Sequence, residues 1–367
     1  MLAQPEQRGR FVTLESFILD TFTRIDEDGT ERPLDRPDEI GGAGTYTIIG
    51  ARIFSAPSSL GMIVDYTPET LPPDIKAKLE RYGPESFIFR PRQDGQPTIR
   101  AVNRYRGQLR LFEYLTAPLF LTPASLRGTP LEDPLPGIIH FVPMRDRMVQ
   151  IVREIEDMRE RVGRDSWDPC LVWEPDIPAC VPDCLETIRS ITPSTHIISP
   201  NHSEALSLLS LPPVSGHSAH DTRMALQKAC VGIAGFGPKV AAIVRCGPLG
   251  CCYIDTRKTS RPSEDDVVWV PAYWDASLPE SHGKVVDPTG AGNSFMGGLG
   301  AALHAGKALH EAVLWGTVAS SFMIEQDGLP VLTQHDGVEK WNGEDPGERV
   351  RLLGERMKGR GDGVDMF

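Results

Sequence analysis

Short apolar runs alternate with amphipathic segments along most of this chain, and this alternation restricts the possible folds more than any other feature of the sequence. Residues 61–66, 138–143 and 240–247 have the length and composition of buried strands. Between such runs, segments such as residues 147–163 repeat their apolar side chains at helical spacing. Strands that alternate with helices predict an α/β fold, with a mostly parallel central sheet covered by helices on both faces.

The first apolar run, residues 11–22, predicts a buried strand that ends near an acidic residue, Asp20. A glycine cluster, Gly41, Gly42 and Gly44, then leads into an apolar segment with helical spacing. An acidic residue that closes a buried strand needs a polar partner, so Asp20 is a candidate binding residue. The alternative is a hydrogen-bonded aspartate with a purely structural role.

Two stretches do not fit a buried parallel sheet. Residues 98–118 alternate polar and apolar side chains and are rich in arginine and aromatic residues, which is typical of antiparallel, partly exposed strands. Together with residues 22–36 they predict a small β lid on a single α/β domain that spans residues 11–340. The charged, glycine-rich segment 341–367 is predicted to be a weakly ordered tail.

Charge and composition exclude several classes of function. The chain has 38 lysine and arginine residues against 50 aspartate and glutamate residues, and its net charge of −12 disfavours binding to nucleic acid or to anionic membranes. It has no apolar run of about 18 residues that could span a membrane. Its seven cysteines and nine histidines lack the spacing of a disulfide framework or a zinc site. We therefore expect a cytoplasmic protein with reduced thiols.

The strongest local motif is DPTGAGNSFMGG, residues 287–298. The small residues Gly290, Ala291 and Gly292 allow a tight turn at the start of a helix, where backbone N–H groups and the helix dipole can receive an anion. The sequence has no G-x-x-x-x-G-K-[ST] phosphate-binding loop. The alternative is that these glycines only allow close helix packing.

This motif resembles the C-terminal signature D-T-x-G-A-G-D-x-F-x-G-G of the ribokinase/PfkB carbohydrate kinase family. Other positions match in the expected order: the double glycine at Gly41–Gly42, Asp20, an N-x-x-E motif at Asn201 and Glu204, and a glycine turn at Gly247 and Gly250. Residues 103–116, NRYRGQLRLFEYLT, further resemble the fungal maintenance-of-killer branch of the family.

The resemblance implies a Rossmann-like α/β sandwich with a β lid, and transfer of the ATP γ-phosphate to a hydroxyl of a sugar or nucleoside-like small molecule. It also implies magnesium, leaves a potassium requirement open, and leaves open a homodimer formed through the lid. The implied residues are Gly290, Ala291, Gly292 and Asn293 for catalysis, Asp20, Gly41 and Gly42 for the acceptor, Asn201 and Glu204 for Mg²⁺ through water, and Asn201, Glu204, Gly247, Gly250, Asp287 and Thr289 for the nucleotide. Two arginines are added from their place in the sequence: Arg106, in the predicted lid, for the acceptor, and Arg245, before the glycine turn, for the nucleotide.

Some of these residues have a plain structural alternative. Asn201 followed three residues later by Glu204 is also the pattern of a helix-capping box. Arg245 stands where the family usually has threonine, and it either reaches a phosphate or is a surface residue. Arg106 either closes over the substrate or is an exposed arginine of a lid strand.

The sequence departs from the family where the chemistry is most demanding, because Asn293 replaces the aspartate that takes the proton from the acceptor hydroxyl. An amide cannot act as a general base, although it can still hold the hydroxyl by a hydrogen bond. Three interpretations remain open. The protein is a working phosphotransferase with another base, a pseudokinase that binds nucleotide or sugar as a sensor or scaffold, or a fold recruited to a different reaction.

Overall fold

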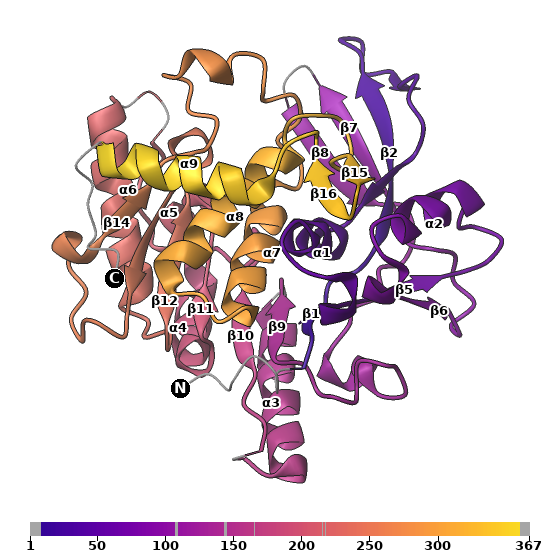
Figure 1. Ribbon diagram of the computed structural model, residues 1–367, viewed down its shortest axis with the longest axis horizontal. Helices are drawn as coiled ribbons and strands as arrows, with labels where there is room; N and C mark the ends of the chain where they lie inside the picture. Colours follow the sequence, from indigo (N-terminus) through magenta and orange to yellow (C-terminus); the bar gives the residue numbers. More distant parts are fainter. Residues whose placement is uncertain are drawn as a thin grey trace.

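The computed structural model describes residues 9–359 except 107–108, 143–144, 165, 215 and 217. In this part of the chain a nine-stranded sheet crosses the molecule (Figure 1). All its neighbouring strands are parallel except for two antiparallel pairs at one edge, β12 with β13 and β13 with β14. In spatial order its strands are β14 (Val268–Val270), β13 (Cys251–Asp255), β12 (Ala241–Arg245), β11 (Ile197–Ile198), β10 (Cys170–Trp173), β9 (Ile138–Phe141), β1 (Phe11–Thr13), β5 (Leu60–Tyr66) and β6 (Phe87–Pro91).

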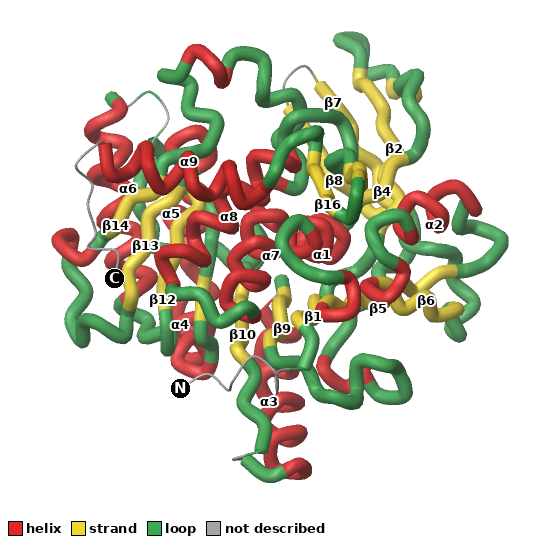
Figure 2. The backbone as a smooth tube through the Cα atoms, viewed as in Figure 1, coloured by secondary structure: helices red, strands yellow, loops and turns green. Residues whose placement is uncertain are grey.

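Helices cover both faces of this sheet (Figure 2). Alternate residues of one strand enter different cores: Phe11 packs with one set of helices and Val12 with the other, because successive strand side chains point to opposite faces. The predicted α/β class with a mostly parallel sheet is confirmed. One face is covered by α1 (Ala43–Arg52), α2 (Pro73–Glu80), α7 (Ala291–His304), α8 (Leu309–Met323) and α9 (Pro346–Gly359), and the other by α3 (Arg145–Val162), α4 (Leu185–Ile191), α5 (His202–Leu208) and α6 (Ala219–Ala234).

The first apolar run forms two strands in two different sheets, not the single strand that the sequence predicts. β1 ends at Thr13 in the central sheet, and β2 (Ile18–Ile25) begins a separate sheet. Polar side chains hold the connection: Glu15 Oε1 accepts a hydrogen bond from the Val142 amide at 2.8 Å, and Ser16 Oγ donates to the Leu119 carbonyl oxygen at 2.6 Å. Asp20 therefore lies within a strand of the second sheet.

The second sheet is the lid, which projects from one end of the central sheet in Figure 1. It contains β2 paired with β3 (Glu31–Pro33) and β4 (Glu39–Gly41), and β7 (Arg100–Arg106) paired with β8 (Leu109–Tyr114). These pairs are antiparallel, whereas β2 and β7 are parallel. Because β2 and β7 are far apart in sequence, their direction could not be inferred from local alternation.

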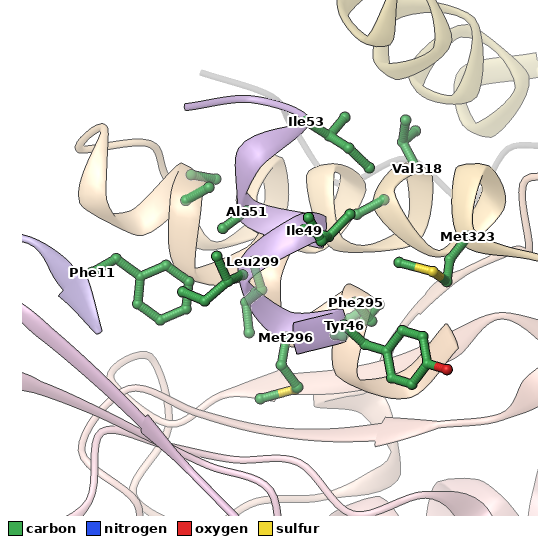
Figure 3. Packing of buried hydrophobic residues seen from close by; sticks show 14 of the residues in the cluster. Phe11, Tyr46, Ile49, Ala51, Ile53, Phe295, Met296, Leu299, Val318 and Met323 are labelled. Atoms are coloured by element: carbon green, nitrogen blue, oxygen red, sulfur yellow. The ribbon is translucent and has the colours of Figure 1, made fainter. Parts of the chain in front are cut away.

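Helices α1 and α7 pack side by side over the central sheet (Figure 3). Tyr46 of α1 lies against Gly290, and Gly50 lies against Ser294. Tyr46 lies in the first turn of α1 and Gly290 caps α7, so this contact joins the starts of the two helices. Their amino-terminal ends consequently lie together at one edge of the sheet.

The C-terminal segment is not a weakly ordered tail over residues 341–359, contrary to the sequence prediction. A hairpin of β15 (Leu332–His335) and β16 (Val338–Trp341) precedes α9. Trp341, Leu353 and Met357 are buried in the main core, and Arg349 is 1% exposed and pairs with Glu325 at 2.7 Å. The prediction was wrong because it took the many charged residues as a sign of disorder, whereas they belong to an amphipathic helix with a buried arginine. In the part of the chain that is described, no helix is long and apolar enough to cross a membrane.

Candidate active site

Two helix amino termini meet at the carboxyl edge of the parallel strands. Gly42 caps α1 with φ of 93°, and Gly290 caps α7 with φ of 77°. A side chain at either position would be strained and would collide with a neighbour, Ser16 O at Gly42 and the Tyr46 ring at Gly290. Each terminus carries a partial positive charge. Their convergence at this edge of an open α/β sheet forms a site suited to anionic and polar ligands.

The turn before α7 is accessible and retains amides that can bind an anion. The amides of Ala291 and Ser294 donate to the carbonyl oxygens of Pro288 at 3.2 Å and Gly290 at 2.8 Å. Those of Gly292 and Asn293 lie in the first helical turn, where a helix provides no acceptor of its own. Residues 290–293 are half-buried and are not enclosed in the core.

Asp287 and Thr289 shape the entry to this turn. The Thr289 amide donates a hydrogen bond to Asp287 Oδ1 at 2.9 Å, and both residues are half-buried. Asp287 therefore has a local structural contact before the helix.

Asp20, Gly41 and Gly42 are brought together at the base of the lid. In the pairing of β2 with β4, Ile18 lies opposite Gly41 and Asp20 opposite Glu39. Asp20 is 4% exposed, and its carboxylate occupies the space that a side chain at Gly41 would need. The double glycine thus gives room to a buried carboxylate beside the amino terminus of α1.

Glu174 faces this turn from the central sheet and was not among the residues singled out from the sequence. It directly follows β10 and is 5% exposed. Its Oε2 accepts a hydrogen bond from Asn293 Nδ2 at 2.9 Å and lies 3.4 Å from His140 Nε2. His140 Nδ1 in turn lies 3.0 Å from Thr13 Oγ1. Because a carboxylate only accepts, the Asn293 amide group must direct its Nδ2 toward Glu174 and its Oδ1 away from it.

Arg245, at the end of β12, connects Glu174 to a second glutamate. Its Nη1 lies 2.7 Å from Glu174 Oε1, and its Nη2 lies 3.7 Å from Glu204 Oε2. Nη2 also donates to the Ser199 carbonyl oxygen at 3.1 Å. The guanidinium lies directly against Gly292, where even a methyl group would displace it. Arg245 is thus a buried residue of the site, with 11% of its side chain exposed.

Asn201 and Glu204 form the capping box of α5. Asn201 Oδ1 accepts from the Glu204 amide at 2.9 Å, and Glu204 Oε2 accepts from the Asn201 amide at 2.6 Å. Asn201 also forms an isolated bridge with Arg245. Asn201 and Glu204 therefore do form the helix-capping box that their spacing also predicts, and this arrangement places Glu204 beside Arg245.

The glutamates at this edge have shifted pKa values. Burial raises the pKa of Glu204 to about 7, although Arg245 and the Asn201 amide oppose the shift. Burial of its carboxyl group likewise raises the pKa of Glu15 to about 7. For Glu174, burial is outweighed by Arg245, His140 and Asn293, which together hold its pKa below the ordinary value. Glu174 is consequently an ionised carboxylate at neutral pH.

Gly247 and Gly250 form the turn that joins β12 to β13, immediately after Arg245. Both have positive φ, of 55° and 88°. The Cys246 amide donates to the Gly250 carbonyl oxygen at 2.7 Å, which closes the turn. The structure thus brings Asn201, Glu204 and Arg245 together, and the turn with the two glycines follows Arg245 directly.

Arg106 is not brought to the other predicted residues. It is exposed at the outer end of β7, five residues beyond Ala101, the partner of Asp20 in the β2–β7 pairing. At about 3.3 Å per residue this places its backbone roughly 16 Å from the register of Asp20.

Glu174, His140 and Thr13 were not identified as site residues from the sequence. Glu174 carries the same signal that identified Asp20, an acidic residue directly after a buried run, here LVWE. His140 lies within a strand of four buried residues and is readable from the sequence only as a core histidine. No group of three or more His, Cys, Asp or Glu residues that could hold a metal ion is found within the described ranges.

Comparisons with known proteins agree with this geometry. The model of the pfkB family of carbohydrate kinases matches residues 172–333. The chain is 31% identical over 354 residues to an uncharacterized protein of Schizosaccharomyces pombe. This alignment covers 95% of the chain and 93% of that protein. The chain is 27% identical over 357 residues to protein MAK32 of Saccharomyces cerevisiae, covering 92% and 90%. Both relatives are fungal, as the resemblance of residues 103–116 indicated.

A solved structure shows the same fold. Ribokinase from Cryptococcus neoformans, in complex with ADP, superposes with a TM-score of 0.60 at 18% identity, covering 95% of this chain and 99% of that one. The two chains therefore share the whole architecture.

Proposed function

Because the chain belongs to the pfkB family of carbohydrate kinases, we propose that it transfers the γ-phosphoryl group of ATP to a hydroxyl of a sugar or nucleoside-like small molecule. The observation that carries the proposal is the meeting of the two glycine-capped helix termini, at Gly42 and Gly290, on the carboxyl edge of the sheet. One terminus lies beside a buried carboxylate suited to sugar hydroxyls, and the other offers amides suited to phosphate.

The proposal assigns each side of the site a task. Asp20 with Gly41 and Gly42 holds the acceptor hydroxyls, and the amides of Gly292 and Asn293 receive the transferred phosphoryl group. Gly247 and Gly250 shape the nucleotide site next to Arg245. Such a transfer depends mainly on positioning and charge stabilisation, which these groups can supply without a strong base.

We assign the removal of the acceptor's hydroxyl proton to Glu174. The acceptor oxygen forms a bond to the γ-phosphorus, the bond from that phosphorus to the β–γ bridging oxygen breaks, and ADP leaves. Asn293 Oδ1 accepts a hydrogen bond from a neighbouring hydroxyl of the acceptor and so orients it, and the proton of the reacting hydroxyl passes to the Glu174 carboxylate, which holds Asn293 by a 2.9 Å hydrogen bond. Since the pKa of Glu174 is lowered, it is a weak base, and turnover should be slow.

The test is ADP formation by the full chain with a panel of sugars and nucleosides. We expect slow turnover by the wild type, a loss of about 10²-fold or more in Glu174→Gln, and a gain in Asn293→Asp, because a positioned base contributes about 10²–10⁴-fold. If the wild type and Asn293→Asp both bind ATP and neither forms ADP with any acceptor, phosphotransfer is excluded.

A second candidate function is binding without transfer, as a sensor or scaffold. The observation that favours it is that Asn293, at the position of the family's base, is tied by its amide to Glu174, which is itself paired with Arg245. Binding of ATP or sugar without ADP formation in the same experiment supports this function.

A homodimer through the lid is also part of the proposal. Strand β8 and the segment after it expose large apolar side chains that are 40–50% accessible: Leu111, Phe112, Tyr114, Leu115 and Phe120. Apolar exposure on a small sheet favours pairing with a second surface.

A further inference from the structure

The Arg245 guanidinium lies between two carboxylates, those of Glu174 and Glu204, beside the amides proposed to receive phosphate. We propose that this side chain takes over the charge-neutralising task of a metal ion, so that the site binds nucleoside polyphosphates without a divalent cation. The inference deepens the proposed function and rests on it, because it concerns the same phosphate site.

Charge and geometry support this assignment. Arg245 has one carboxylate on each side, Glu174 at 2.7 Å and Glu204 at 3.7 Å, and it touches the first turn of α7 at Gly292. It therefore stands between the acidic groups and the amides that would receive phosphate. A phosphate placed at those amides would meet the guanidinium before it met either carboxylate, so the arginine would screen it from their negative charge.

Three of the four carboxylate oxygens are already engaged, which does not fit a divalent cation. Glu174 uses Oε1 for Arg245 and Oε2 for Asn293, and Glu204 uses Oε2 for the Asn201 amide. Mg²⁺ requires near-octahedral oxygen ligands at about 2.0–2.1 Å. A cation at this place would have to displace Arg245 or accept its positive charge as a neighbour. Direct coordination of magnesium by Asn201 and Glu204 does not fit this arrangement, and their action through water stays a prediction.

The guanidinium keeps donors for a ligand. Within the described chain, Nε of Arg245 is buried and has no hydrogen-bond acceptor. An arginine has five N–H donors in a planar fork that can serve a carboxylate and a phosphate together. The pair with Glu174 holds this fork in place, so little side-chain entropy remains to be lost when phosphate binds.

The test is calorimetric titration of the full chain with ATP, in EDTA and again with excess Mg²⁺. We expect the two dissociation constants to agree within about threefold. A loss of more than about tenfold in EDTA would overturn the inference while leaving the proposed function intact. Absence of ATP binding under both conditions would overturn both. Binding in EDTA without ADP formation in either medium would support this inference and refute the proposed phosphotransfer.

A variant separates the arginine from the rest of the site. Arg245→Gln should lose at least about tenfold in ATP affinity in EDTA and recover part of it with Mg²⁺, because the freed carboxylates can then attract the cation. Mg²⁺ alone should raise the melting temperature of this variant but not that of the wild type. Arg257→Gln, which breaks a half-exposed pair with Asp255, is the matched control and should behave as the wild type. An equal Mg²⁺ dependence in wild type and Arg245→Gln would contradict the proposal.

Discussion

The two sides of the candidate site depart from the kinase pattern to different degrees. At the base of the lid, Asp20, Gly41 and Gly42 keep the family's residues and pack together as an acceptor site would require. Around the start of α7 the glycines are kept, but the acidic base is replaced by Asn293 and the threonine of the nucleotide turn by Arg245. These two replacements contact the same residue, Glu174.

That shared contact suggests that the two replacements act together. An aspartate at position 293 would bring a second negative charge within hydrogen-bond distance of Glu174, whereas asparagine donates to it. Arg245 supplies a positive charge to the same carboxylate. The proposed phosphate side is therefore an electrostatic network that departs from the family's pattern, whereas the proposed acceptor side keeps that pattern. The following predictions test this contrast, from the largest expected effect to the smallest.

The largest effect is expected from Arg245→Met. It leaves Glu174 and Glu204 buried without their cation, and loss of one partner of a buried pair costs about 3–5 kcal/mol in the free energy of unfolding. Urea unfolding measures this loss. Adding Glu174→Gln should restore part of it, while Arg257→Met, at a half-exposed pair, should cost no more than about 1 kcal/mol. Equal costs for Arg245→Met and Arg257→Met would refute the network.

The next effect concerns the pH dependence of stability. The folded-state pKa of Glu204 is about 7 against an ordinary 4.5, so its contribution is fully present below pH 4.5 and is lost as the pH rises to about 7. Glu204→Gln should therefore lose less stability than the wild type between these pH values, with a difference of up to about 3 kcal/mol. Urea unfolding at pH 5 and pH 7.5 measures this difference. Identical slopes in the two proteins would show that Glu204 does not carry the effect.

A smaller effect is expected on the acceptor side. Asp20→Asn keeps the shape beside Gly41 but removes the charge, and we expect kcat/KM for the acceptor to fall by about 10- to 100-fold. ATP affinity in the absence of acceptor should stay unchanged, in contrast to Arg245→Gln. If Asp20→Asn weakened ATP binding as strongly as it weakened acceptor use, the division of the site into two sides would be incorrect.

The smallest change in stability is expected at the lid surface. Phe112 is 47% exposed on β8, so Phe112→Ser should alter the free energy of unfolding by about 0.5 kcal/mol or less. Sedimentation should show a dimer for the wild type and a monomer for Phe112→Ser. A wild type that sediments as a monomer at all concentrations would exclude the proposed lid pairing.

The residues that could be predicted from the sequence are those whose signal is local. The turn at Gly290, the capping pair Asn201 and Glu204, and the glycines of the β12–β13 turn each depend on a few consecutive residues. The break between β1 and β2 could not be predicted, because residues 11–22 are apolar on both sides of it. Contacts with residues 119 and 142, far away in the sequence, hold the chain as it changes sheets.

The sequence by itself determined the alternating α/β class, the glycine-capped start of α7 and the loss of the family's base at Asn293, because apolar periodicity and backbone permissiveness are properties of neighbouring residues. Only the tertiary structure decided what surrounds Asn293. Thr13, His140 and Arg245 lie in three different strands and Glu174 directly follows a fourth, and they meet because parallel strands end at the same edge. Charges this far apart in sequence interact only after the sheet has formed, and so the electrostatics of the site belong to the fold.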